Sequence, residues 1–271
     1  MSKKLYTIIT FLFIFSFIVI SSIGAVTKTP VNNQGKIADY RWMQANQMNM
    51  PLTNYSKFGQ TIGGDAGLYW PSGFPNETYI YGAGIWIGGL VRNAVDPTRF
   101  DTQLTCGYDP NSGAIEFIQG LPPNDDINTN PNERIYFSLD DDWPLQDSTG
   151  QDSVLSTLDS YCTYNDYLES KHLVPENKPL NVSVIQQTYC WTGTLKEDII
   201  FFVFNVILDP EADTVHGTFL GVCTDNDIGN ESGTNANDLV GFDVARNMAF
   251  QWQNCLLYTS DAADDMQCVD L

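Results

Sequence analysis

The chain has 271 residues, a formal net charge of −20 and an aromatic content of 13%. This acidity argues against binding to nucleic acids or anionic lipids, because their phosphate groups would be repelled. The aromatic and β-branched content is ample for a buried core, which excludes a globally disordered chain, and the length allows one large β domain or two small ones.

The N-terminal segment has the composition of a secretory signal peptide. Lys3 and Lys4 precede an apolar run over residues 5–20, and small residues follow as far as Ala25. The run is short for a membrane-spanning helix, which needs roughly 20 apolar residues. We therefore predict that residues 1–25 are a cleaved signal peptide and that no stable membrane span remains; an uncleaved anchor is the alternative.

The first half of the mature segment is rich in turn-forming residues and contains short strand candidates. Residues 26–67 are polar and irregular, with many glycines and asparagines, which is typical of loops. Residues 79–90 are rich in β-formers but interrupted by glycines, and this pattern predicts a strand with close packing or a bulge. Shorter strands are expected at residues 114–118 and 134–139, and an exposed loop at residues 121–132.

The second half carries the strongest fold signal, a pair of long strands joined by a short connection. Residues 182–191 would place even-numbered positions on one face and odd-numbered positions on the other. Residues 199–208 are apolar at nearly every position, which predicts a strand covered on both faces, and residues 193–198 would close an antiparallel hairpin. Further strands are expected at residues 218–224 and 244–252, and short helical turns at residues 153–158 and 165–172.

Together these patterns predict a mainly β fold of β-sandwich-like antiparallel sheets with long loops and few short helices. Residues 26–254 would form this β-rich extracellular domain. Three tryptophans are expected to supply core surface, namely Trp86, Trp191 and Trp252.

An acidic, glycine-containing segment near the end of the domain is the candidate metal site. Its predicted ligands are Asp225, Asp227, Asn230, Glu231, Asp238 and Asp243. Calcium prefers six to eight oxygen ligands, and glycines let a loop fold around the ion. The spacing is not that of an EF-hand, because Ala236 stands where the twelfth-position glutamate would be. The alternative is an exposed acidic loop whose side chains cap their own turns.

Two other surface features are candidate ligand sites. The acidic run at residues 140–142, followed by Trp143, would hold a cation or a sugar, or else form a solvated turn. A set of nearby aromatic residues would form a carbohydrate platform, or else pack in the core. These residues are Tyr69, Trp70, Tyr79 and Tyr81.

The four cysteines of the domain leave two interpretations open. They are Cys106, Cys162, Cys190 and Cys223. An even number in an exported chain permits two disulfides with three connectivities, whereas free buried thiols are the alternative. The absence of a Cys-x-x-Cys pair argues against a zinc or redox site.

Sequence signals for catalysis are weak. The two histidines, His172 and His216, lie outside any His-Glu-x-x-His motif, and the sequence has no Gly-x-Ser-x-Gly or phosphate-binding loop. His216 precedes Gly217 between two strand candidates, which favours a role in a turn. Paired carboxylates can hydrolyse glycosides, but the sequence does not reveal their separation.

Residues 255–271 resemble a translated transposase-type sequencing adapter. The stretches from Cys255 to Asp265 and from Cys268 to Leu271 correspond to its two constant parts, at the correct spacing. We therefore expect this tail to be an assembly artefact, with the native sequence interrupted near Asn254 and downstream domains missing. The same tail on an intact genomic copy of the gene would refute that interpretation.

Several segments resemble large exported proteins of Bacteroidota and related phyla. The matching stretches are residues 51–59, 67–71, 82–89, 185–191, 198–204, 225–229 and 237–243. The resemblance implies secretion, or exposure on the outer surface of a Gram-negative bacterium, by the type IX route. That family is largely uncharacterised, so the resemblance implies little about activity.

The sequence thus predicts a non-enzymatic β-sandwich module of a secreted or cell-surface protein, stabilised by calcium, for attachment or ligand display. Its partner would be an extracellular glycan or protein. The alternative is a polysaccharide hydrolase or its accessory carbohydrate-binding region, and a ligand-free spacer is a third hypothesis.

Overall fold

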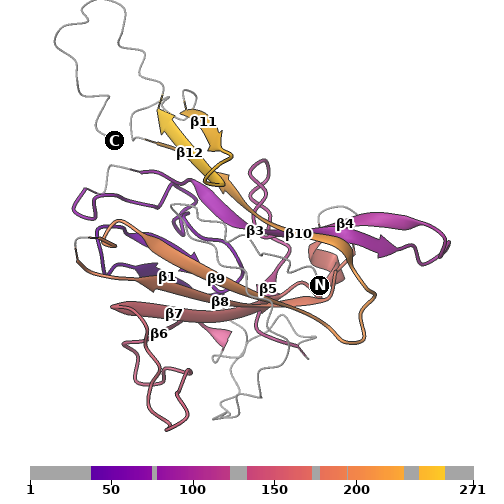
Figure 1. The fold of residues 1–271 in the computed structure, drawn as a ribbon, viewed down its shortest axis with the longest axis horizontal. Helices are drawn as coiled ribbons and strands as arrows, with labels where there is room; N and C mark the ends of the chain where they lie inside the picture. The colour runs from indigo at the N-terminus through magenta and orange to yellow at the C-terminus, as the bar shows by residue number, and fades with distance from the viewer. Residues whose placement is uncertain are drawn as a thin grey trace, which may run out of the picture.

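The computed structural model describes residues 38–74, 78–122, 133–172, 178–193, 195–228 and 238–253. Strands dominate these ranges, and the only helical element named in them is a short 3-10 turn, η2, at Glu169–Lys171 (Figure 1). The predicted signal peptide and the adapter-like tail lie outside the described residues. Within the described ranges, no helix is long and apolar enough to cross a membrane.

One antiparallel sheet is built around the predicted pair of long strands. Its order is β5 (Ile118–Gln119), β7 (Leu158–Asn165), β8 (Val182–Cys190) and β9 (Ile200–Leu208), and β6 (Tyr136–Phe137) also pairs with β7. Cys190 lies opposite Ile200, which confirms the predicted hairpin. Along β8 the even-numbered side chains are buried and most odd-numbered ones are half-buried, as the alternation predicts.

A second set of strands covers this sheet. β1 (Tyr40–Met43) pairs with β2 (Met50–Thr53), and β3 (Gly82–Arg92) lies between β4 (Phe100–Cys106) and β10 (His216–Asp225). The glycines of β3 allow close approach, as predicted. A Cβ atom on Gly84 would lie 2.5 Å from the backbone carbonyl carbon of Gly107, so only glycine fits there.

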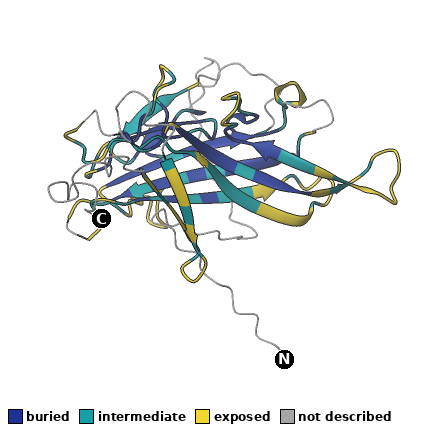
Figure 2. Cartoon of the chain, turned by 90° about the horizontal axis from the view of Figure 1, so that it is seen from above, coloured by how far each residue is buried: buried dark blue, intermediate teal, exposed yellow. Residues whose placement is uncertain are grey.

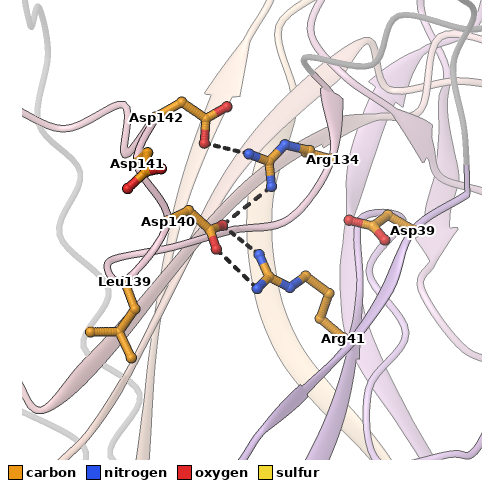
Figure 3. Close-up of a pocket in the computed structure, with 7 residues that line it drawn as sticks. All are labelled: Asp39, Arg41, Arg134, Leu139, Asp140, Asp141 and Asp142. Carbon is orange, nitrogen blue, oxygen red and sulfur yellow. Dashed lines mark hydrogen bonds and ion pairs between the residues drawn. The ribbon is translucent and has the colours of Figure 1, made fainter.

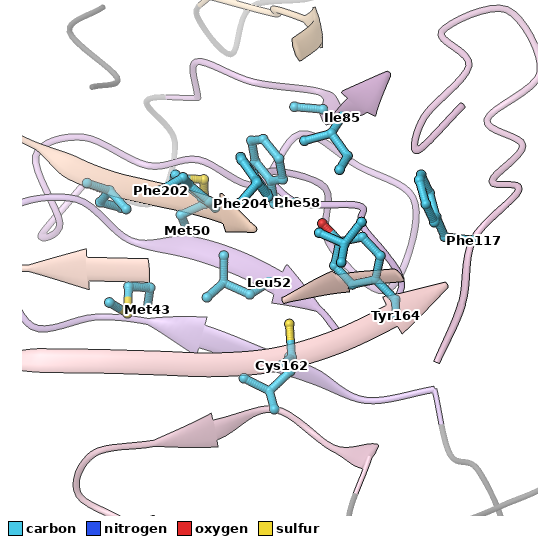
Figure 4. Packing of buried hydrophobic residues seen from close by; sticks show 14 of the residues in the cluster. Met43, Met50, Leu52, Phe58, Ile85, Phe117, Cys162, Tyr164, Phe202 and Phe204 are labelled. Atoms are coloured by element: carbon cyan, nitrogen blue, oxygen red, sulfur yellow. The ribbon is translucent and has the colours of Figure 1, made fainter. Parts of the chain in front are cut away.

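The hydrophobic core lies between these two sets of strands (Figure 4). The rings of Phe58 and Phe202 lie 4.6 Å apart, and those of Phe117 and Tyr164 lie 5.1 Å apart. Buried positions run through the paired strands, while loops and strand ends are exposed (Figure 2). The predicted mainly β, sandwich-like class is confirmed.

A separate hairpin follows β10 in the chain. β11 (Asp238–Asp243) pairs with β12 (Met248–Gln253) in a two-stranded sheet, which projects from the body beside β3 and β10 at the top of Figure 1. The core cluster takes no side chain from the described residues of this hairpin.

Several local predictions were wrong. Residues 153–158 do not form a helical turn, because Leu158 begins the central strand β7. β9 is buried on one face only at Ile200, Phe202 and Phe204, is half-buried on the other face, and ends in exposed residues, since one layer covers it. Trp252 is 36% exposed because its hairpin stands outside the core. Strands β1, β2, β4, β7 and β11 were not predicted, and residues 244–247 of the predicted last strand form a turn. The turn η2 lies within the expected helical turn at residues 165–172.

Candidate functional site

The structure brings three of the six predicted metal ligands to the base of the β11–β12 hairpin. Asp225 ends β10, Asp227 follows it, and Asp238 begins β11. The Tyr108 hydroxyl donates to Asp225 Oδ2 at 3.1 Å, and the Ile228 amide donates to Asp238 Oδ2 at 3.1 Å. Asp238 Oδ1 is buried and has no hydrogen-bond partner among the described residues.

These carboxylates interact unfavourably with one another. The pKa of Asp227 is raised, first by partial burial and then by the negative charges of Asp238 and Asp225. A cation placed between them would relieve this repulsion. The arrangement is therefore electrostatically suited to a positive charge.

Asp243, another predicted ligand, is not part of this group. Asp243 lies at the far end of β11, roughly 17 Å from Asp238 at about 3.4 Å per strand residue, and forms an ion pair with Arg246. Asn230 and Glu231 lie outside the described residues. Within the described ranges, no group of three or more histidine, cysteine, aspartate or glutamate residues is arranged to hold a metal ion.

An open hollow of about 670 Å³ lies beside the second acidic run (Figure 3). Arg41 from β1 donates to both oxygens of Asp140, at 2.5 and 3.1 Å. Arg134 donates to Asp140 at 3.2 Å and also pairs with Asp142. The ion pairs link β1 to the segments before and after β6, so they join parts of the chain that are far apart in sequence.

Aromatic rings support the two arginines of this hollow. The guanidinium carbon of Arg41 lies 4.0 Å from the centre of the Phe137 ring, and that of Arg134 lies 4.4 Å from the Tyr136 ring. Partial burial alone would raise the pKa of Asp140, but hydrogen bonds from Arg41 and the Phe137 amide, with the arginine charges, lower it overall. The sequence indicated only Asp140, Asp141 and Asp142 of this site, because Arg41 lies 99 residues from Asp140 in the chain and Arg134 belongs to a strand candidate.

Trp143 does not provide a sugar-stacking surface. It is 4% exposed, and its indole nitrogen donates to the Ser153 carbonyl at 3.0 Å. The predicted contact between a sugar and this ring is therefore wrong. Asp141 and Asp142 stay exposed at the rim of the hollow.

The predicted aromatic platform is only partly exposed. Trp70 and Tyr81 are 38% and 36% exposed, and the Trp70 indole nitrogen donates to Asp198 Oδ1 at 2.8 Å. Tyr69 stacks on Trp42 with ring centres 5.6 Å apart. These rings mainly pack on one another and on polar neighbours.

A buried polar cluster escaped the sequence analysis. Asp166 is fully buried and accepts hydrogen bonds from the Thr105 hydroxyl at 2.6 Å and from the amides of Leu180 and Val182 at 2.8 and 2.7 Å. His172 Nε2 lies 3.0 Å from the Asp166 carbonyl oxygen, so it is the donor of that bond. The carboxylate ties three separate segments together.

The same histidine lies beside a buried glutamate. His172 Nδ1 is 3.7 Å from Glu116 Oε2, and both side chains are 1% exposed. Glu116 Oε2 accepts the Cys106 amide at 2.7 Å. Because the pair is enclosed by protein, it serves the fold rather than contact with a dissolved substrate. The other histidine, His216, begins β10 and packs edge-on against Phe100.

All four cysteines of the domain are free thiols, of which Cys223 is the only half-buried one. Burial raises the pKa of Cys106 to about 12 and that of Cys190 to about 11. Since the thiolate is the reactive form, these two residues are inert at neutral pH. The structure thus agrees with free thiols and not with two disulfides, the two interpretations that the sequence left open.

Comparisons with known proteins found no match. No protein-family model matches the chain. No curated protein and no solved structure is similar to it either.

Proposed function

We propose that this chain is a non-enzymatic β-sandwich module of a secreted or cell-surface protein, which serves attachment or ligand display. The observation that carries the proposal is the β11–β12 hairpin, which holds apolar side chains away from the core and beside a group of carboxylates. Exposed apolar patches with polar rims are typical of interaction sites. The N-terminal sequence and the resemblance to exported Bacteroidota proteins support display on the outer surface of a Gram-negative bacterium, or secretion by the type IX route.

Binding assays on the purified chain test this function against the alternative. We expect binding to an extracellular protein or glycan preparation without release of reducing sugar from polysaccharides. Hydrolysis that disappears when a carboxylate of the Arg41–Asp140 hollow is replaced would instead support the polysaccharide hydrolase, because paired carboxylates perform that reaction. Glycan binding without hydrolysis would favour the accessory carbohydrate-binding region.

We further propose that calcium stabilises the base of the hairpin. Asp225, Asp227 and Asp238 would supply carboxylate oxygens, and Asn230 and Glu231 would supply further ligands from the neighbouring segment. The raised pKa of Asp227 and the unpartnered oxygen of Asp238 support this proposal, because a cation would relieve the repulsion and satisfy the oxygen.

A melting experiment with and without calcium tests the site. We expect calcium to raise the melting temperature of the unmodified protein, since a ligand that binds only the folded state stabilises it. The shift should disappear in the Asp225→Ala plus Asp227→Ala variant. It should persist in the Asp243→Ala control, because Asp243 lies at the other end of β11. No calcium shift in the unmodified protein would contradict the proposal.

A further inference from the structure

The β11–β12 hairpin concentrates exposed apolar side chains. Residues 238–253 include six large apolar residues that remain exposed: Leu239, Val240, Phe242, Val244, Phe250 and Trp252. Val240 is 76% exposed and Phe242 is 54% exposed. Isolated exposed apolar residues are ordinary on protein surfaces, but a contiguous group marks an interaction surface.

Both faces of this hairpin are apolar. The register places Leu239 opposite Trp252, and Phe242 opposite Ala249. Directly opposed residues share a face, so Leu239 and Trp252 lie on one side and Phe242 on the other. Phe250 and Trp252 stack with ring centres 5.4 Å apart. A two-stranded sheet without a core face is marginally stable in water, so a covering partner would stabilise it.

Few described contacts attach the hairpin to the body. The Ile228 amide donates to Asp238, and the Asn226 and Gln251 side chains are hydrogen-bonded to each other. Within the described residues, β11 and β12 pair only with each other. Their outer edges therefore present backbone donors and acceptors on which an added strand can pair.

The charge around the hairpin selects the partner. Asp225, Asp227 and Asp238 lie at its base, and Asp243 lies at its other end, where it is paired with Arg246. A second copy of the chain would bring further carboxylates to the same place, since each copy carries a formal net charge of −20. A basic partner would meet complementary charge instead.

We propose that the β11–β12 hairpin docks an extended segment of a partner protein in which apolar side chains alternate with lysine or arginine. The segment adds a strand to a free edge of the hairpin. Its apolar side chains lie beside Leu239, Phe250 and Trp252 on one face. Its basic side chains alternate onto the other face, which carries Asp238, and reach the aspartates when no cation occupies them. This inference rests on the proposed role in attachment and specifies the chemistry of the partner.

Two synthetic ten-residue peptides serve as probes, one alternating valine with lysine and the other alternating valine with glutamate. Fluorescence anisotropy with the full chain should show binding of the lysine peptide only, weakening as salt is added because charge contributes. The Leu239→Ser plus Phe250→Ser variant should bind at least about tenfold more weakly, equivalent to about 1.4 kcal/mol.

A matched variant controls for loss of apolar surface elsewhere. Val95 and Ile62 are 93% and 85% exposed, in loops that do not belong to the hairpin, so Val95→Ser plus Ile62→Ser should bind the lysine peptide as the unmodified chain does. Equal binding of both peptides, or full binding by the hairpin variant, overturns the inference. A dimer of the unmodified chain that the hairpin variant abolishes also overturns it, because the occupant is then a second copy.

Hydrogen exchange on the unmodified chain provides a measurement that does not depend on the folding of a variant. The lysine peptide should slow exchange of amides in residues 238–253, and unchanged exchange there overturns the inference. If the hairpin variant still binds an extracellular protein or glycan, the proposed function holds and only the proposed partner of the hairpin is wrong. Polysaccharide hydrolysis would remove the proposed function while leaving the peptide result intact.

Discussion

Some aspartates of this acidic chain stabilise the folded state and others destabilise it. The difference depends on whether a buried carboxylate receives hydrogen bonds. Asp166 is fully buried but satisfies three donors from distant segments. Asp227 is half-buried among other carboxylates, which raise its pKa after the effect of burial. The first residue stabilises the fold through its hydrogen bonds, whereas the second adds a charge that a bound cation would offset.

Replacing the buried carboxylate should be strongly destabilising. Asp166→Ala leaves the Thr105 hydroxyl and the amides of Leu180 and Val182 without their acceptor, and we expect a loss of about 2–4 kcal/mol in the free energy of unfolding. Urea denaturation measures this loss. The exposed Asp141→Ala variant is the control and should unfold at the urea concentration of the unmodified protein. Equal stability of the two variants would contradict this account of Asp166.

At the scale of elements, polar contacts fix strands whose sequences do not suggest pairing. β1 is held to the segments around β6 by Arg41, Arg134 and Asp140. β7 contains the buried Asp159, which accepts the amides of Leu155 and Ser156 at 2.6 and 2.8 Å. The sequence does not indicate this strand, because a buried aspartate is unusual in a strand and the amides that donate to it belong to the preceding bend.

The Asp140 ion pairs predict a pH-dependent contribution to stability. The pKa of Asp140 is lower in the folded state than its ordinary value, so its contribution is present above that ordinary value and is lost as pH falls through the folded value. Asp140→Asn should lower the free energy of unfolding by about 1–2 kcal/mol near neutral pH, since the paired groups are partly solvated.

Urea titrations at several pH values measure this effect. The difference between Asp140→Asn and the unmodified protein should shrink as the solution is acidified. The Asp142→Asn control should have a smaller effect at neutral pH, because the Asp142 side chain is 63% exposed. A difference that stays constant with pH would show that the charge of Asp140 is not the cause.

The described part of the molecule is held together by packing between two layers of strands and not by disulfides between its cysteines. Cys162 lies opposite Gln186, and Cys190 lies opposite Leu158. Their positions in the sheet are therefore four residues apart, roughly 13 Å at about 3.3 Å per residue. A disulfide needs Cα atoms within about 7 Å, so these two thiols cannot be joined without rearranging the sheet.

A reducing agent should consequently leave the stability of the domain unchanged. We expect the same melting temperature with and without dithiothreitol, because the four cysteines among the described residues are free thiols and form no cross-link that would constrain the unfolded chain. The comparison is made at equal pH and calcium concentration, so that other linked equilibria stay constant. A melting temperature that falls on reduction would show that the domain contains a disulfide.

The fold class and the most regular strands follow from the sequence alone. β8 and β9 were predictable because their apolar pattern is long and local, and the glycines of β3 indicated the close backbone approach at Gly84. The acidic residues at the base of the hairpin were also found from the sequence, since Asp225 and Asp227 are neighbours in the chain.

The sequence does not show which polar residues meet or which apolar residues stay outside the core, because both depend on the folded arrangement of distant segments. Arg41 reaches Asp140 across almost a hundred residues, and Asp166 accepts donors from segments that precede and follow it in the chain. Trp252 reads as a core residue, yet the chain carries it onto a projecting hairpin. The physical reason is that hydrophobic patterning acts locally, whereas the pairing of charges and the covering of a face depend on segments brought together by folding.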